Sequence, residues 1–275
     1  MSLRINTNVS SLAIQHAMTL SQRVTDQAIN NIATGSRLSN PASDVAGTAI
    51  AEQMKSEITS LGAAKSNASS AVGIVSVAEG SLSEQSSILT RMRELAVQSA
   101  SDTYSDKERS MMQKEFVEIR DESDRIAQST KYGTQNLLDG SINKFEFQVG
   151  STAGAESRIS YNSESNTTSD NLGISSSDVS SKGDARDSLS DIDQGLEKIA
   201  MQRASFGATQ SRLESVDSSL GSRIEGLSNA RSKVADSDLA KEISDLRRGQ
   251  ILQQYQASML QQVNDQAGLA LKLVG

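Results

Sequence analysis

The sequence contains no cysteine and no tryptophan, and its 275 residues include one proline, four phenylalanines and four tyrosines. Without cysteine the fold cannot use disulfide bonds, so stability outside the cell would have to come from packing or from assembly. So few aromatic side chains exclude the thick aromatic core of an ordinary globular enzyme. The residues that dominate instead, chiefly Ala, Ser, Gln, Leu, Asp and Glu, favour helices that bury thin apolar stripes.

Charge and hydropathy exclude further classes of protein. The formal net charge is -7 and the isoelectric point is about 4.9, which argues against a nucleic-acid partner because such a partner requires a basic face. No apolar run approaches the roughly 18 to 20 residues of a membrane span. Residues 1–18 lack a continuous apolar segment, so we expect no secretory signal peptide.

A repeat of apolar side chains at every seventh residue predicts a long helix near the carboxy end. At about 1.5 Å per residue, a helix over residues 189–234 extends on the order of 70 Å, which is too long for a compact domain. The predicted seam positions of this helix are Ile192, Ile199, Phe206, Leu213, Leu220, Leu227 and Val234.

A second seven-residue repeat, in the amino-terminal half, predicts a partner helix with the seam positions Leu61, Ala68, Val75, Leu82, Leu89 and Ala96. Small residues at 64, 71 and 78 lie beside this seam and allow a neighbouring backbone to approach closely. A third segment, from Met112 to Ile126, has apolar residues spaced by fours and threes, and Asp106 is its predicted N-cap. Three such helices predict a bundle.

The segment near residues 140–185 has a different pattern. Phe145, Phe147 and Val149 alternate with polar residues, and Ile159 and Tyr161 alternate after a Gly-rich stretch, which predicts a small β-hairpin. Residues 162–184 are rich in Ser, Asn and Asp with little to bury. We expect them to form an exposed loop in which the chain reverses.

Both chain ends carry apolar stripes at helical spacing, the first of which ends at Gly35. A chain that folds back would place these two helices side by side and antiparallel. Ordering roughly seventy-five terminal residues costs about 1 to 2 kcal/mol each in backbone entropy, more than one two-helix contact offsets. We therefore expect the ends to be largely disordered in the monomer and to become ordered when other copies cover their remaining faces.

Glutamines and asparagines between the apolar positions permit such an interface, because amides cost less to bury than charges. The predicted subunit-assembly residues are Ile5, Val9, Leu12, Leu20, Val24, Ile32, Leu252, Tyr255, Met259, Val263 and Val274. Together the patterns predict a mainly α fold: an elongated bundle of long helices with paired terminal coiled-coil helices and a small β-hairpin.

The sequence offers no signal for catalysis. His16 is the single histidine and has no cysteine to accompany it, so we interpret it as a packing or surface residue and not as a metal ligand. No stretch resembles a nucleophile elbow, an HExxH motif or a phosphate loop. We expect no enzyme activity, no catalytic residues, no metal and no cofactor.

Seven segments, in this order along the chain, resemble the terminal regions of bacterial flagellins. They are INTNVSSLAIQ, GSRLSNPASDVAG, TAIAEQM, RMRELAVQSAS, FGATQSRLES, LSNARSKVADSDLAKEISDL and RGQILQQYQASML. The resemblance covers nearly the whole chain except about residues 140–185. It implies an extracellular filament subunit that polymerises with copies of itself, without the large outer domains of longer flagellins.

The resemblance also implies a domain division and a set of partners. Residues 1–44 and 235–275 would form an inner domain of terminal helices, and residues 45–234 an outer helical rod. The chain would leave the cell unfolded through the flagellar type III apparatus, without a cleaved signal peptide, after binding a dedicated cytosolic chaperone at its carboxy-terminal region. Hook-associated cap and junction proteins would be neighbours in the flagellum.

Flagellins that the innate immune receptor recognises carry a basic residue, a leucine and an acidic residue on the outer helical domain. Arg91, Leu95 and Glu115 match that pattern. Two alternatives to a filament subunit remain at this point. One is a hook–filament junction protein of the same family, and the other is a soluble coiled-coil signalling protein.

Overall fold

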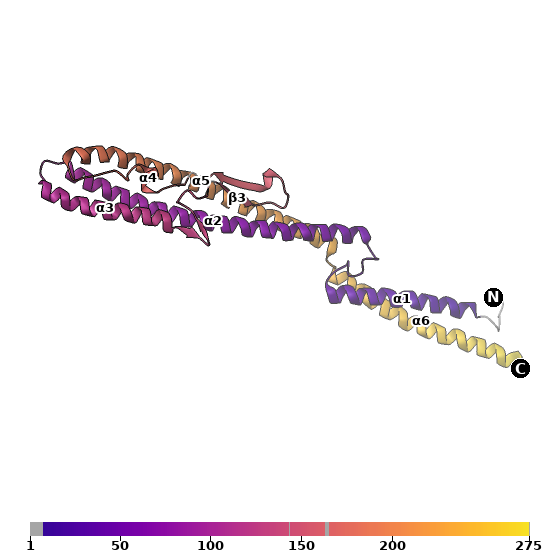
Figure 1. Cartoon of the computed structure of the whole chain (residues 1–275). Coiled ribbons are helices and arrows are strands. Elements are labelled where there is room, and N and C mark those ends of the chain that lie inside the picture. Colours follow the sequence, from indigo (N-terminus) through magenta and orange to yellow (C-terminus); the bar gives the residue numbers. More distant parts are fainter. Residues whose placement is uncertain (1–7, 143, 163–164, 275) are drawn as a thin grey trace. The chain divides into compact units, whose positions relative to one another are not determined.

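The computed structural model describes residues 8–142, 144–162 and 165–274, and side chains up to residue 265 other than that of Asn162. The elements, in chain order, are α1 (Val9–Thr34), α2 (Val45–Ser99), α3 (Asp106–Ser129), β1 (Lys131–Tyr132), β2 (Gln135–Asn136), β3 (Lys144–Gln148), a 3-10 turn (Ala155–Ser157), β4 (Arg158–Asn162), α4 (Ser169–Leu172), α5 (Lys182–Ala235) and α6 (Leu239–Val274) (Figure 1). Long helices packed in a bundle with a small hairpin confirm the predicted fold class.

The chain forms two compact units. The first consists of Met1–Ser56 and Gly226–Gly275, and the second of Glu57–Glu225. The limits between the units fall inside α2 and α5, each of which contributes to both units. The domain boundaries predicted from the sequence lie instead where α2 begins and α5 ends.

In the second unit, α2 and α5 run antiparallel. Ion pairs show the direction: Lys65 of α2 lies 3.8 Å from Asp217, whereas Arg93, farther along α2, lies 2.7 Å from Asp193. The structure buries the predicted seam residues Leu61, Val75, Leu82, Leu89, Ile192, Ile199, Phe206, Leu213 and Leu220, and half-buries Leu227 and Val234. The two seven-residue repeats therefore face the bundle core.

The buried face of α2 includes a large polar side chain, that of Gln85. Gln85 follows the buried Ala64, Ala71 and Ala78 at the same seven-residue spacing on α2. Its side-chain amide donates to the carbonyl oxygens of Ser123 (3.0 Å) and Thr167 (3.3 Å). Because an unpaired buried amide is costly, these two bonds favour one alignment of α2 with α3 and with the segment before α4.

The start of α3 differs from the prediction by one residue. The N-cap is Ser105, and Asp106 is the first helical residue. The backbone N–H of Ser105 donates to Glu108 (2.7 Å), and the N–H of Glu108 lies 3.5 Å from the Ser105 hydroxyl. Ser followed three residues later by Glu forms a reciprocal capping box, which an aspartate in the first turn reinforces electrostatically.

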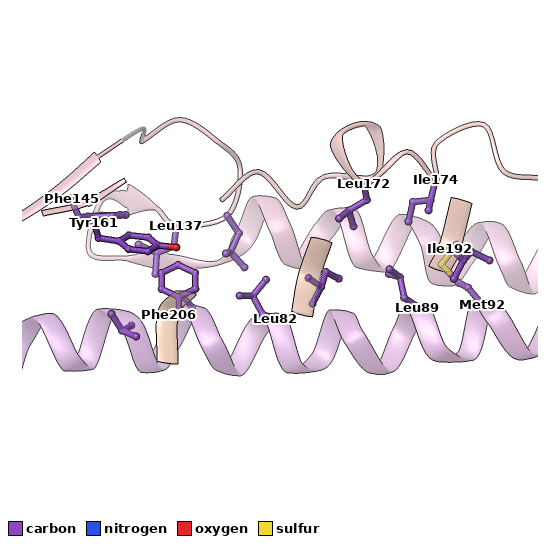
Figure 2. Packing of buried hydrophobic residues seen from close by; sticks show 14 of the residues in the cluster. Leu82, Leu89, Met92, Leu137, Phe145, Tyr161, Leu172, Ile174, Ile192 and Phe206 are labelled. Atoms are coloured by element: carbon purple, nitrogen blue, oxygen red, sulfur yellow. The ribbon is translucent and has the colours of Figure 1, made fainter. Parts of the chain in front are cut away.

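The predicted hairpin is present as β3 and β4. These strands pair antiparallel, with Phe145 opposite Tyr161 and Phe147 opposite Ile159. The Tyr161 ring packs against Phe206 of α5, with centroids 4.9 Å apart (Figure 2). The short pair of β1 and β2 was not predicted, because strands of two residues are too short to show an alternating pattern.

The prediction that residues 162–184 have little to bury is wrong. Leu172, Ile174 and Val179 are buried in the main cluster, and Figure 2 shows Leu172 and Ile174 among its side chains. The hydroxyl of Ser165 donates to the carbonyl of Leu137 (2.8 Å), and the backbone N–H of Thr167 donates to that of Leu138 (2.9 Å). Ser165 and Thr167 can be buried here because backbone carbonyls accept hydrogen bonds from them.

We predict that Leu213→Ala destabilises the second unit by about 2 to 5 kcal/mol, because it removes a fully buried side chain and leaves a cavity. Urea unfolding followed by circular dichroism measures this change. Met201→Ala is the matched control on the same helix, since Met201 is 58% exposed and its loss should cost less than about 0.5 kcal/mol. Equal losses for the two variants would contradict the assigned seam.

Candidate functional site

The two terminal helices, α1 and α6, pair antiparallel within the first unit (Figure 1). Asn31, near the end of α1, donates to Glu242, near the start of α6 (3.1 Å). Farther along, the side-chain amide of Gln253 donates to that of Gln22 (2.9 Å), and Gln256 donates to the Ser21 hydroxyl (3.1 Å). Amides that the sequence analysis assigned to contacts between subunits thus join the two helices of one chain.

Small side chains bring α1 and α6 close together. On α1 the buried residues are Ser11, Thr25, Ala28 and Asn31, and on α6 Gly249 is buried. A Cβ added at Gly249 would overlap the Thr25 hydroxyl, so a side chain at this position would displace that hydroxyl from its present place. The sequence did not predict this seam, because the predicted stripes were traced through large apolar residues. The small or polar residues Thr25, Ala28 and Asn31, about one turn apart on α1, were the available signal.

Because the fully buried residues of the seam are small or polar, many of the large apolar residues of the two helices face outward. Leu12 is 57% exposed and Tyr255 is 65% exposed. Of the predicted assembly residues, Val9, Leu12, Leu20, Val24, Leu252 and Tyr255 are exposed, and Ile32, Met259 and Val263 are half-buried. Ile5 and the side chain of Val274 lie outside the described residues. Prediction from the sequence overlooked Ile29 and Ile251, which are also exposed.

An apolar surface of this kind favours association over chemistry. Fully burying one aliphatic side chain contributes about 1.5 to 3 kcal/mol, and contiguous exposed apolar patches mark interaction sites. Among the described residues, His, Asp and Glu side chains form no group of three that could hold a metal. His16 lies on the exposed surface of α1. None of the helices, within those residues, has the length and apolar character to cross a membrane.

The predicted receptor-contact residues lie in the second unit. Glu115 of α3 accepts hydrogen bonds from two guanidinium nitrogens of Arg91 of α2, at 3.1 and 2.7 Å, and Glu94 accepts a third at 2.9 Å. The Glu115 hydrogen bonds, followed by that of Glu94, raise the pKa of Arg91. Leu95 is 2% exposed and belongs to the hydrophobic core. The structure therefore presents Arg91 and Glu115 at the surface, whereas Leu95 is buried in the core.

A bundle of long helices, accompanied by paired terminal helices whose large apolar residues face outward, is typical of helical structural subunits that assemble into polymers. Comparison with known families identifies the subunit more closely. Residues 5–143 match the bacterial flagellin N-terminal helical region, and residues 189–273 match the bacterial flagellin C-terminal helical region. The chain belongs to the bacterial flagellin family.

Similar proteins align with this chain over nearly their whole length. A flagellin of Halalkalibacterium halodurans is 31% identical over 270 residues, which cover 98% of this chain and 99% of the relative. The flagellar filament 30.7 kDa core protein of Treponema maltophilum is 32% identical over 289 residues, with 98% and 99% covered. A flagellin of Bacillus subtilis is 30% identical over 306 residues, with 99% and 100% covered. The similarity thus includes the central region as well as both ends.

Two solved structures share the fold. The crystal structure of Bacillus cereus flagellin has a TM-score of 0.51 and 24% sequence identity, and the match covers 56% of this chain and 88% of that chain. The structure of a putative flagellar hook-associated protein from Vibrio parahaemolyticus has a TM-score of 0.59 and 14% identity, with 70% and 100% covered. At these identities the likeness shows the fold alone.

We predict that Gly249→Ala weakens the pairing of α1 with α6 by about 1 to 3 kcal/mol, because the new methyl group collides with Thr25 and forces the helices apart. Hydrogen exchange at the amides of both helices measures the effect. Gly226→Ala is the control, because a Cβ at that position meets no neighbour. It should stabilise α5 by about 0.5 to 1 kcal/mol. Unchanged exchange in the Gly249 variant would refute the close contact.

Proposed function

We propose that the chain is a repeating structural subunit of the bacterial flagellar filament and that it polymerises through the outward faces of α1 and α6. Membership of the flagellin family supports the filament role. The observation that supports the mechanism is the exposure of large apolar residues, Leu12 and Tyr255 among them, on helices already paired through their small residues.

The energetics of the terminal pair favour contacts between subunits. Ordering each residue costs about 1 to 2 kcal/mol in backbone entropy, and a seam of small residues and amides recovers little of this cost by burial. Neighbouring copies supply the missing apolar contacts when they cover the outward faces. The structure describes residues 9–34 and 239–274 as paired helices, and the disorder of these ends in the free subunit stays a prediction.

The main alternative is a hook–filament junction protein of the same family. The flagellins and the filament core protein align over nearly the full chain at 30 to 32% identity, whereas the hook-associated structure is 14% identical and shares the fold. These relationships favour a subunit present in many copies. A soluble signalling coiled coil is not supported, because both terminal regions match the flagellin family.

We predict that Leu12→Gln raises the critical concentration for polymerisation on filament seeds by about tenfold. Glutamine keeps the helix propensity of leucine but cannot replace its apolar contact, and a loss of about 1.4 kcal/mol corresponds to a tenfold change. Because Leu12 is exposed in the single chain, the circular dichroism and unfolding of the subunit should not change.

Electron microscopy and sedimentation of seeded samples give the critical concentration. Gln15→Ala, an exposed polar position on the same helix, should change it by no more than about twofold, since surface substitutions cost within about 0.5 kcal/mol. If Leu12→Gln polymerises like the unaltered chain, this face of α1 is not an assembly surface. If the unaltered chain itself never extends seeds, the filament role fails.

The route out of the cell is a further part of the proposal. The outward apolar faces would require cover before export, which supports a cytosolic chaperone bound to the carboxy-terminal region and passage through the flagellar type III apparatus. Hook-associated cap and junction proteins would then be neighbours at the ends of the filament. Secretion of the chain by cells without that apparatus would contradict the route.

We also propose that an innate immune receptor contacts Arg91 and Glu115. The support is their joint exposure on neighbouring helices with a fixed geometry. Arg91→Ala should weaken binding to the receptor ectodomain by about tenfold or more, because arginines are frequent interface hot spots. Surface plasmon resonance measures this. Arg125→Ala, which removes a comparable exposed ion pair with Glu122, is the control, and equal effects would contradict the proposed contact.

A further inference from the structure

The seam between α1 and α6 specifies its own register weakly. Apart from the close approach of Gly249 to Thr25, the contacts between α1 and α6 described above involve small side chains and amides. Gln250, Gln253 and Gln256 follow one another at intervals of three residues, so a slip of one helical turn replaces one amide with another. Large interlocking side chains fix the register in ordinary coiled coils. Here no large apolar side chain of α1, or of α6 up to residue 265, is fully buried: many are exposed, and others, such as Ile32 and Val263, are half-buried.

A pair of loops joins the two helices at one end. The loop after α1 and the loop before α6 form an antiparallel bridge between Ser36 and Asp236. The backbone N–H of Arg37 donates to the carbonyl of Ala235 (2.8 Å), and the N–H of Ser237 donates to that of Gly35 (3.0 Å). We call residues 35–37 and 235–237 the loop clamp. It lies where α1 ends and just before α6 begins.

The side chain of Arg37 connects the clamp to two further helices. Its guanidinium donates to the carbonyl of Val234, in the last turn of α5 (2.9 Å), and lies 3.1 Å from the carboxylate of Asp44, which precedes α2. Asp44 also accepts from the backbone N–H of Gly47 (2.8 Å). This bond, and then the Arg37 guanidinium, lower the pKa of Asp44, so the carboxylate stays charged at neutral pH.

Arg37 contributes to geometry more than to stability. Its side chain is 48% exposed, and exposed ion pairs contribute little to the free energy of folding. A helix is a stiff rod that rises about 1.5 Å per residue, so an anchor at one end fixes the position of every later residue. Asn31 then meets Glu242, and Gln22 meets Gln253.

We propose that Arg37 is a positioning residue for assembly: it holds the loop clamp, and the clamp sets the register in which α1 and α6 pair. This inference rests on the proposed function. A slip of one turn moves the outward face of α6 by about 5.4 Å along α1. The surface that both helices form together would then no longer fit a neighbouring copy, since a repeating interface requires the same complementary patch on every subunit.

The first test is polymerisation on filament seeds. Arg37→Gln should raise the critical concentration about tenfold, and Arg37→Lys, which keeps the charge and a donor, should stay within about threefold of the unaltered chain. Thermal unfolding of the second unit should be unchanged in both. Arg248→Gln, which removes an exposed ion pair within α6, is the control. A normal critical concentration for Arg37→Gln would overturn the proposal.

The second test measures the register of α1 and α6 directly, by disulfide cross-linking between introduced cysteines. Because the chain has no native cysteine, only the introduced pairs can form a disulfide. A Cβ at Gly249 lies 3.5 Å from the Cβ of Thr25, within the range of a disulfide. The double variant Thr25→Cys/Gly249→Cys therefore reports the native register, and Thr25→Cys/Leu246→Cys reports a slip of one turn. Each pair is oxidised in filaments formed above the critical concentration, with and without Arg37→Gln, and cross-linking is measured by mass spectrometry.

We expect Arg37→Gln to lower cross-linking of the native pair and raise that of the slipped pair. An unchanged pattern, or loss of both cross-links, would show that Arg37 does not set the register. Failure of the proposed function gives a different result, because the unaltered chain would then not extend seeds. In that case the same cross-links, measured in the soluble chain, still decide whether Arg37 sets the register.

Discussion

The close contact between α1 and α6 decides which side chains the terminal helices present to other molecules. Gly249 lies so close to Thr25 that a side chain at this position would overlap the Thr25 hydroxyl, and the buried residues of α1 are small or polar. Each helix has a limited angular width for apolar residues. When small residues occupy the inward stripe, the large ones face away from the partner helix. A pairing based on leucines would have covered those residues and left a polar exterior with little to assemble.

The same chain therefore uses two kinds of helix contact. In the second unit, large residues such as Leu82, Leu89 and Phe206 are covered within the chain, and this burial offsets the entropy of folding without a neighbour. In the first unit the contact is narrow and rich in amides, so much of its apolar surface is left for other copies. A bundle whose apolar residues are covered within the chain, joined to terminal helices whose large apolar residues are exposed, suits a subunit that polymerises.

Sequence patterns predicted the parts of the fold that local periodicity controls. The seven-residue repeats placed Leu61 and Leu213 in the core, and Gly35, at a φ of 66°, ends α1 as its position after the apolar stripe indicated. Patterns failed where burial depends on partners that are distant in the chain. Ser165 is buried because the carbonyl of Leu137 accepts its hydroxyl, and no property of the Ser-rich segment reveals that carbonyl.

The sequence by itself determined the class of fold, the absence of disulfides, the long seams of the bundle and the resemblance to flagellins, because each depends on composition or on spacing along one chain. The tertiary structure decided which stripe of each terminal helix faces inward, placed Leu95 in the core and joined Arg37 to Val234. These depend on how closely two distant segments approach. That distance is set by side-chain volume at the contact, as at Gly249, and periodicity along one helix carries no information about it.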